Sequence, residues 1–218
     1  MALVFTGDEF ADGGAFISNT LQQHKVKASF FFTGRFYRNK KFRSLINKLK
    51  NNGHYLGPHS NEHLLYADWK KRDSLLVSKQ QFKTDLLNNY AAMNTFGIAK
   101  KKAAFFLPPY EWYNDSIAAW TKELGSTLIN YTPGTLSHAD YTTPDATNYR
   151  DSKTIYNSII NYERRSTSGL NGFILLMHIG TDAKRKDPFY TMLPQLLQWL
   201  YSNGYKLVKI DTLLKDGL

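Results

Sequence analysis

Two histidines four residues apart, His59 and His63 in the stretch "HSNEH", could bind a metal ion. Two other places carry suitable groups: Asp8 and Glu9 are adjacent in "TGDE", and His178 directly follows the apolar run "ILLM". Two imidazoles and one carboxylate make a three-ligand metal site that leaves positions open for water and substrate. A second carboxylate can then act as general base and a third histidine as general acid. These residue types therefore indicate metal-assisted hydrolysis.

Each of these signals has a plain structural alternative. Asp8 and Glu9 could lie in a solvated turn, and His178 could be a hydrogen-bonded core histidine. The spacing H-x-x-x-H also occurs without a metal, and "HSNEH" is not the H-E-x-x-H of zinc proteases, because Glu62 adjoins the second histidine. The hypothesis of a single site therefore depends on where the fold brings these residues.

The elements that must position them alternate between strands and helices. Apolar, β-branched or aromatic runs predict seven strands, at residues 2–6, 28–33, 54–57, 103–107, 126–132, 172–178 and 206–210. Helical patterns lie between them, at residues 16–23, 42–51, 79–96, 115–124, 154–164 and 189–202, and a short final helix is expected at 212–215. Repeated β-α units predict an α/β fold with parallel strands, either an open doubly wound sheet or a closed barrel.

The candidate residues all follow predicted strands, and in both kinds of β/α fold functional sites form where the strands end. Asp8 and Glu9 follow the first strand, His59 and His63 follow the third, and His178 ends the sixth. We therefore expect these five side chains at one edge of the sheet or barrel. The longest irregular segment, residues 132–152, is expected to be a functional loop, because structureless loops of that length are uncommon in compact domains.

Composition limits the class of protein. With 218 residues, 42% of them hydrophobic and 15% aromatic, the chain is expected to form one domain, residues 1–218, with a substantial core. It has no cysteine, which excludes thiol nucleophiles and Cys-based zinc sites. No apolar stretch is long enough to span a membrane, and the opening "MALVFTGDEF" reads as a strand and not as a signal peptide, as in a domain excised from a longer protein.

The chain is basic, with a formal net charge of +10. The lysines and arginines occur in short separate clusters, which favours solvated surface charge over a nucleic-acid interface. No nucleic-acid motif accompanies them. We expect a monomer without a nucleic-acid partner, to which other domains of a longer chain could be attached.

In chain order, the segments "TGDE" (6–9), "HSNEH" (59–63), "LPPY" (107–110), "ADY" (139–141) and "LMH" (176–178) resemble the motifs of one known family. The chain is similar to the polysaccharide deacetylases, the NodB-homology domain of carbohydrate esterase family 4. The resemblance implies a distorted (β/α)7 barrel that removes acetyl groups from N- or O-acetylated polysaccharides or oligosaccharides. It also implies a bacterial periplasmic or extracellular location.

The resemblance assigns a role to each matching residue. Asp8 would be the base and His178 the general acid, and a divalent metal would be held by Glu9, His59 and His63. Zn²⁺ is the expected metal, with Co²⁺, Ni²⁺ and Mn²⁺ as alternatives. The backbone N–H of Tyr110 would help to hold the oxyanion, Leu176 would line the pocket for the acetyl methyl, and Asp140 would orient His178. Trp112, an aromatic residue near a strand end, is expected to contact the sugar.

The sequence also departs from the family pattern. The second carboxylate is Glu9 where the family has aspartate, and Leu107 replaces the arginine that positions the base, so no cation for Asp8 can be named from the motifs. Glu111 follows "LPPY" where glycine is common. These departures keep open the alternative of a catalytically impaired, carbohydrate-binding domain. Aromatic residues near the strand ends are expected to be exposed and to stack on sugars, or else to pack in the core: Tyr66, Trp69, Trp112, Tyr113 and Tyr141.

Overall fold

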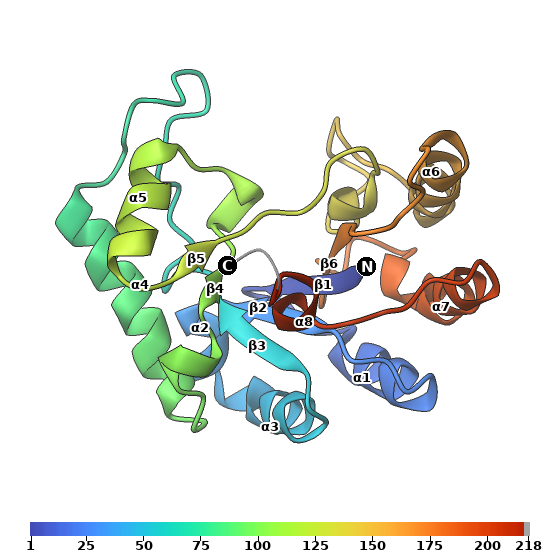
Figure 1. Cartoon of the computed structure of the whole chain (residues 1–218), viewed down its shortest axis with the longest axis horizontal. Helices are drawn as coiled ribbons and strands as arrows, with labels where there is room; N and C mark the ends of the chain where they lie inside the picture. Colours follow the sequence, from blue (N-terminus) through green and yellow to red (C-terminus); the bar gives the residue numbers. More distant parts are fainter. Residues whose placement is uncertain (216–218) are drawn as a thin grey trace.

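A computed structural model of the protein describes residues 1–215, and its strands form two parallel sheets (Figure 1). The larger sheet has the order β3-β2-β1-β6, and the smaller one pairs β4 with β5. Their bounds are β1 Ala2–Gly7, β2 Ser29–Phe32, β3 Tyr55–Pro58, β4 Phe105–Phe106, β5 Thr127–Leu128 and β6 Ile174–His178. Thr6 of β1 pairs with Phe31 of β2 and with His178 of β6, so the strands end level with one another.

Hydrogen bonds at two seams join the sheets into a closed ring. On one side the N–H of Leu107, just after β4, donates to the carbonyl of Pro58 at the end of β3 (3.3 Å). On the other side the N–H of Thr132, beyond β5, donates to the carbonyl of Ile174 in β6, and Thr132 Oγ1 accepts from the Ile174 N–H (both 3.0 Å). The result is the distorted barrel of parallel strands that the family resemblance implied.

The predicted seventh strand, 206–210, is wrong. This segment makes two hydrogen bonds to Met1, which lies just before β1: Lys206 O accepts from the terminal amine and Val208 N–H donates to the Met1 carbonyl. The chain then turns away, because α8 (Ile210–Leu213) begins at once and the Ile210 N–H is bound by Ser29 Oγ. The segment thus closes the N-terminal end of the barrel without pairing along a strand, and α8 lies two residues earlier than predicted.

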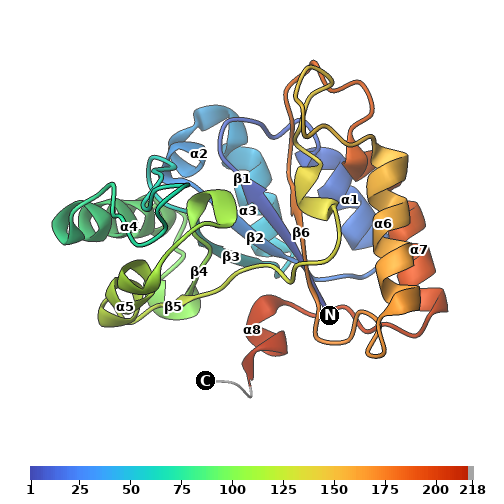
Figure 2. The ribbon, with the colours of Figure 1, turned by 90° about the horizontal axis from the view of Figure 1, so that it is seen from above.

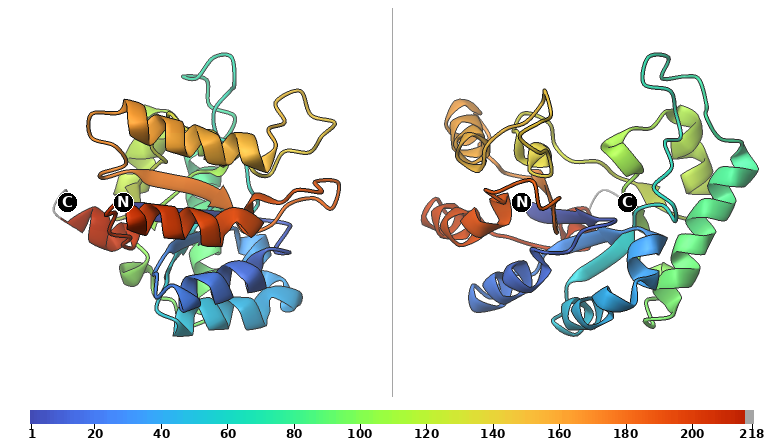
Figure 3. Two further views of the ribbon diagram at one scale, coloured as in Figure 1. Left: turned by 90° about the vertical axis from the view of Figure 1, so that its right-hand side faces the viewer. Right: turned by 180° about the vertical axis from the view of Figure 1, so that it is seen from behind.

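Helices surround the strands, with α6, α7 and α1 in order along one side of the barrel and α4 and α5 on the opposite side (Figures 2 and 3). The bounds are α1 Gly14–Gln23, α3 Arg43–Asn51, α4 Lys79–Asn94, α5 Asp115–Glu123, α6 Ser152–Arg165 and α7 Leu193–Ser202, all near their predicted positions. One helix was not predicted: α2 (Gly34–Arg38) is five residues long and is capped by Thr33 Oγ1, which accepts from the Phe36 N–H. Short 3-10 helices occur at η1 Lys40–Phe42, η2 Lys100–Lys102, η3 Pro109–Glu111, η4 Ser137–Ala139 and η5 Phe189–Met192.

Two hydrophobic clusters follow from the alternation of side chains along β1. Leu3 and Phe5 face the surrounding helices and join the larger cluster, whereas Ala2 and Val4 face a smaller cluster inside the barrel. Leu107 and Leu176 complete this inner cluster, and both are fully buried. The apolar interior therefore leaves only the ends of the strands for polar chemistry. No helix within residues 1–215 is long and apolar enough to cross a membrane.

Candidate active site

A pocket of about 190 Å³ lies where β1, β3 and β6 end. Six of the residues expected at the site line it: Asp8, Glu9, His59, His63, Tyr110 and His178. Figure 2 shows that the loop after β1 leaves the barrel at the end opposite to the N-terminus. Residues that are up to 170 positions apart in sequence thus meet because parallel strands end at the same edge.

His59 is fixed by three neighbours. Its backbone N–H donates to Asn89 Oδ1 of α4 (2.8 Å) and to the carbonyl of Phe32 (3.1 Å), and its Nδ1 pairs with the carbonyl of Leu107 (2.7 Å). The carbonyl partner fixes Nδ1 as the donor, so Nε2 carries the free lone pair. Burial and the neighbouring imidazole of His63 lower the pKa of His59 well below its usual value, which keeps the ring neutral.

His63 lies beside His59, with ring centroids 5.1 Å apart. Its backbone is left-handed (φ 55°), a conformation that is unusual for a non-glycine residue and that persists where the surroundings impose it. Burial lowers its pKa to about 4, against the opposing effect of Asp8. Both histidines are therefore neutral at physiological pH, as metal ligands must be.

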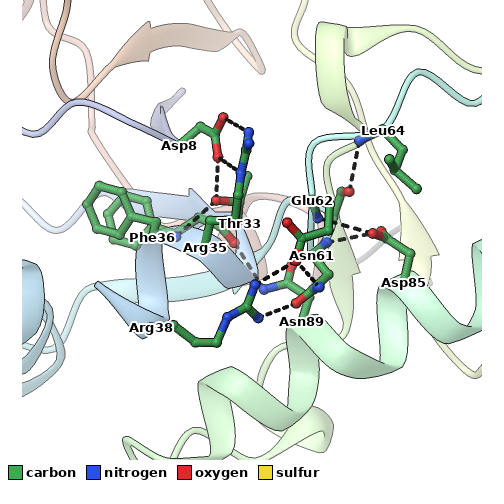
Figure 4. Close-up of polar contacts among 12 residues, drawn as sticks. Asp8, Thr33, Arg35, Phe36, Arg38, Asn61, Glu62, Leu64, Asp85 and Asn89 are labelled. Atoms are coloured by element: carbon green, nitrogen blue, oxygen red, sulfur yellow. Dashed lines mark hydrogen bonds and ion pairs between the residues drawn. The ribbon is translucent and has the colours of Figure 1, made fainter. Parts of the chain in front are cut away.

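Helix α4 anchors the loop that carries both histidines (Figure 4). The buried carboxylate of Asp85 accepts the backbone N–H groups of Asn61 (3.0 Å) and Glu62 (3.1 Å) and the hydroxyl of Tyr66 (2.7 Å). Tyr66 is completely buried, so of its two expected roles, stacking on a sugar or packing in the core, the structure shows core packing. Its phenol is used to hold Asp85, and through Asp85 the histidine loop.

The donor set for a metal is only partly assembled. The two neutral histidines fit a divalent metal, since both line the pocket and His59 has a free Nε2. Glu9 also lines the pocket, but its side chain is exposed at the rim. Among residues 1–215, no three His, Asp or Glu side chains gather closely enough to hold a metal ion.

Asp8 is held by a cation that the motifs did not reveal. Arg35, from α2, donates through Nε to Asp8 Oδ1 (3.1 Å) and forms an ion pair through Nη2 with Oδ2 (Figure 4). Thr33 Oγ1 donates to the same Oδ1 (2.7 Å). The expectation that nothing steers Asp8 in the absence of an arginine at Leu107 is therefore corrected. The usable signal was position, because Thr33 and Arg35 follow directly after β2, next to β1.

His178 is oriented by Asp140, which belongs to the loop between β5 and α6. Asp140 Oδ1 lies 2.6 Å from His178 Nδ1, and Oδ2 accepts the backbone N–H of His178 (2.9 Å). Burial lowers the pKa of His178, but the charge and hydrogen bond of Asp140 outweigh it, and the net pKa is raised. The ring can thus carry a proton while its other nitrogen has no hydrogen-bond partner among residues 1–215. Tyr141 covers it, with ring centroids 4.8 Å apart.

Tyr110 and Glu111 both have left-handed backbones, with φ of 59° and 53°. The Tyr110 ring packs edge-on against His63, with centroids 4.5 Å apart. Glu111 lines the pocket, and burial raises its pKa to about 7. In the sequence Glu111 stands out only as a departure from a common glycine, and no pattern there places its carboxylate in the site.

Two expected substrate contacts lie elsewhere. Leu176 is fully buried in the inner cluster, on the same face of β6 as His178, and is not among the residues that line the pocket. Trp112 lines an adjoining groove instead, where it packs against Trp69 with ring centroids 5.4 Å apart. Of the other aromatic residues expected to be exposed, Trp69 and Tyr141 are about half exposed, and Tyr113 is partly buried.

Comparison with known proteins settles the family. The family model for polysaccharide deacetylases matches residues 11–129, more than half of the chain. The protein belongs to the polysaccharide deacetylase family. A peptidoglycan-N-acetylglucosamine deacetylase of Bacillus cereus is 24% identical over 84% of this chain, and an uncharacterized Bacillus subtilis protein, YlxY, is 27% identical over 90% of it. The chain spans 62% and 51% of the length of these two relatives.

Solved structures share the polysaccharide deacetylase fold. A peptidoglycan N-acetylglucosamine deacetylase superposes with a TM-score of 0.75 at 20% identity, over 97% of this chain and 86% of the other. A pseudoenzyme of carbohydrate esterase family 4 from Bacillus anthracis gives 0.74 at 19% identity, over 98% and 64%. A family 4 acetyl xylan esterase from Clostridium thermocellum, in complex with a cobalt ion, gives 0.73 at 21% identity, over 98% and 89%. The fold is thus shared by enzymes and by a pseudoenzyme.

Proposed function

We propose that this polysaccharide deacetylase family member is an active, metal-dependent hydrolase that removes N- or O-acetyl groups from a polysaccharide or oligosaccharide. The observation that carries the proposal is the pairing of two oriented proton-transfer groups in one pocket. Asp8 is held by Arg35, and His178 is held by Asp140. Each has its partner on one side and the pocket on the other, as a base and an acid require.

In this proposal Asp8 is the general base and takes a proton from the attacking water. Arg35 and Thr33 bind the carboxylate on both oxygens, which fixes its orientation. His178 carries the proton that the leaving sugar nitrogen or oxygen receives, because Asp140 stabilises its charged form. The backbone N–H of Tyr110 is proposed to stabilise the oxyanion.

The metal is proposed to be Zn²⁺ or a related divalent ion, held by His59, His63 and the Glu9 carboxylate. When bound, it would polarise the acetyl carbonyl and lower the pKa of water. Support comes from the neutral state of the two imidazoles, from the carbonyl partner of His59 Nδ1, and from the position of Glu9 on the pocket rim.

Acetate release tests the proposal directly. Purified protein is loaded with Zn²⁺ or Co²⁺, its metal content is measured, and it is assayed on acetylated xylan, on N-acetylated chitooligosaccharides and on peptidoglycan. We expect turnover on at least one substrate, loss of bound metal in His59→Ala, and loss of turnover with metal retained in His178→Ala. Metal-filled protein without turnover on any of these substrates would overturn the enzymatic proposal.

A catalytically impaired carbohydrate-binding domain is the second candidate. It is favoured by the incomplete donor set within residues 1–215, and a similar fold occurs in a pseudoenzyme. It predicts that glycans bind with or without metal and that no acetate is released. Isothermal titration of the same oligosaccharides onto apo and metal-loaded protein measures the binding, and the acetate-release assay distinguishes the two candidates, since only the enzymatic proposal expects metal-dependent turnover.

A further inference from the structure

A second hollow, of about 390 Å³, adjoins the catalytic pocket. We call it the aromatic groove, and it is lined by Trp69, Trp112, Tyr131 and His138 together with three residues shared with the pocket: Tyr110, Glu111 and Tyr141. The pocket alone, at about 190 Å³, is smaller than typical ligand sites of about 300–1,000 Å³. A glycan with its acetyl group in the pocket therefore extends beyond it, and the aromatic groove is the adjoining hollow that offers tryptophan rings to a neighbouring sugar unit.

Glu111 lies at the junction of the two hollows and is held there by its backbone. Its N–H donates to the carbonyl of Pro108 (3.1 Å), and its carbonyl accepts from Asn130 Nδ2 (2.8 Å). The left-handed conformation is unfavourable for glutamate and natural for glycine. Strain of this kind, at a position that aims a carboxylate into a pocket, indicates a functional constraint.

Among the described residues only the charge of His178 acts to lower the pKa of Glu111, against the larger effect of burial. Within residues 1–215 no side chain forms a salt bridge or a hydrogen bond with its carboxylate, although burial raises its pKa to about 7. The groove has one arginine, Arg72, whose Nε donates to the carbonyl of Tyr113 (2.6 Å) and whose guanidinium lies 4.3 Å from the ring of Trp112. Burial lowers the pKa of His138, so that ring is neutral.

A partly exposed carboxylate in a groove of aromatic rings, with no hydrogen-bonded or ion-paired side chain among residues 1–215, is suited to a ligand cation. The carboxylate gains a counter-charge, and ring faces attract an ammonium group. Tyr131 and Tyr141 are both close enough to Glu111 for its charge to raise their pKa values. The cation that a glycan can offer at this place is the free amino group of a sugar unit.

We propose that Glu111 is a specificity-determining residue that selects glycans with a free amino group on the sugar unit next to the acetylated one. The ammonium of that unit pairs with the Glu111 carboxylate while its ring lies in the aromatic groove. The substrate class is thus a partly deacetylated amino-sugar chain. This inference rests on the proposed deacetylase function where turnover is measured, but it does not rest on that function where binding alone is measured.

The kinetic test compares fully acetylated chitooligosaccharides with ones that carry a single free amine, using metal-loaded protein. We expect wild type to prefer the amine-bearing substrates by about tenfold to hundredfold in kcat/KM, the effect of one charged hydrogen-bonded pair. Glu111→Gln should reduce this preference, measured as the ratio of the two kcat/KM values within each protein, to about unity. The same substitution at Glu123, on the exposed end of α5, is the control and should preserve the preference.

A binding test keeps the inference separate from catalysis. Titration of glucosamine oligosaccharides, which have no acetyl group to lose, should show binding to wild type and at least tenfold weaker binding to Glu111→Gln. Equal binding to both proteins, or wild-type binding no tighter than that of N-acetylated oligosaccharides, would overturn it. If the protein binds in this pattern but releases no acetate, the deacetylase proposal fails and the inference about Glu111 stands.

Glu111→Gly distinguishes a functional role from a structural one. Glycine relieves the left-handed strain, so the thermal midpoint should rise or stay level while the preference for the amine is lost. A variant that loses both stability and preference would show that Glu111 supports the loop and does not read the substrate.

Discussion

Arg35 offers the sharpest test of the proposed mechanism, because it is the cation that holds the proposed base. Arg35→Met removes one hydrogen bond of 3.1 Å and one ion pair from Asp8, while the hydrogen bond from Thr33 remains. Methionine keeps much of the length and flexibility of the arginine stem, so the backbone of α2 should be undisturbed. The change therefore isolates the orientation of the carboxylate.

The expected loss of stability is small. The Arg35 side chain is 39% exposed and that of Asp8 is 19% exposed, so solvent screens the pair, and exposed pairs contribute about 0.2–1 kcal/mol. We therefore expect the free energy of unfolding to fall by about 1 kcal/mol or less. A larger drop would mean that Arg35 is chiefly structural.

The expected loss of rate is larger. A general base contributes about 10²–10⁴-fold to turnover. Arg35 only orients that base, so removing Arg35 should cost part of this factor. We expect kcat to fall by about 10–100-fold, equivalent to about 1.4–2.7 kcal/mol in the barrier, with KM and metal content near their wild-type values. The kcat of Arg35→Lys should lie between those of wild type and Arg35→Met, since lysine keeps the charge and loses the bidentate geometry.

Arg38→Met is the matched control. Arg38 is on the same helix, and its guanidinium pairs with Asn61 and with Glu62 (2.6 Å to Oε1), with no contact to Asp8 (Figure 4). It should keep kcat within the range of wild type. If Arg35→Met also keeps wild-type kcat with a full complement of metal, either Asp8 needs no orienting cation or Asp8 is not the base.

Three further outcomes are expected. Asp140→Asn removes the carboxylate that raises the pKa of His178, so the alkaline limb of the pH–rate profile should move to lower pH. An unchanged limb would show that this limb does not report the titration of His178. His54 is buried and its pKa is lowered to about 4, so the folded state binds the proton less well than the unfolded state. The stability that neutral His54 contributes is therefore present above pH 6.5. It is lost as the pH falls from 6.5 toward 4, by up to about 3 kcal/mol. His54→Asn should remove most of that acid sensitivity in urea titrations at pH 7 and pH 4.5. Phe82→Ala should lower the free energy of unfolding by about 3–5 kcal/mol, because Phe82 is fully buried against Tyr66 and Phe106.

Much of the fold could be read from the sequence, because long periodic segments carry strong signals. The order of strands and helices follows from apolar runs such as the one that became β6, and α4 carries a capping box formed by Ser78 and Gln81 at its start. The segment 206–210 was misread because its apolar and β-branched residues Leu207, Val208 and Ile210 imitate a strand, although its partner backbone is only that of Met1. α2 is too short to show a helical period.

The site was only partly predictable, for a different reason. Histidines and adjacent acids are rare enough to be noticed at strand ends, whereas the chain has 28 lysines and arginines, so one arginine after β2 attracts no attention. Its significance appears only when β1 and β2 are placed side by side. Glu111 escaped because its orientation depends on a left-handed backbone, and glutamate has no preference for one.

The seam between β3 and β4 has a consequence for how this site can change over time. His59 Nδ1 binds the carbonyl of Leu107, the residue whose N–H closes the ring onto Pro58. The imidazole therefore helps to hold the barrel closed between β3 and β4, in addition to being a candidate metal ligand. In a descendant without turnover, replacing His59 would still remove this hydrogen bond at the seam. Selection for folding alone is therefore sufficient to retain the histidine.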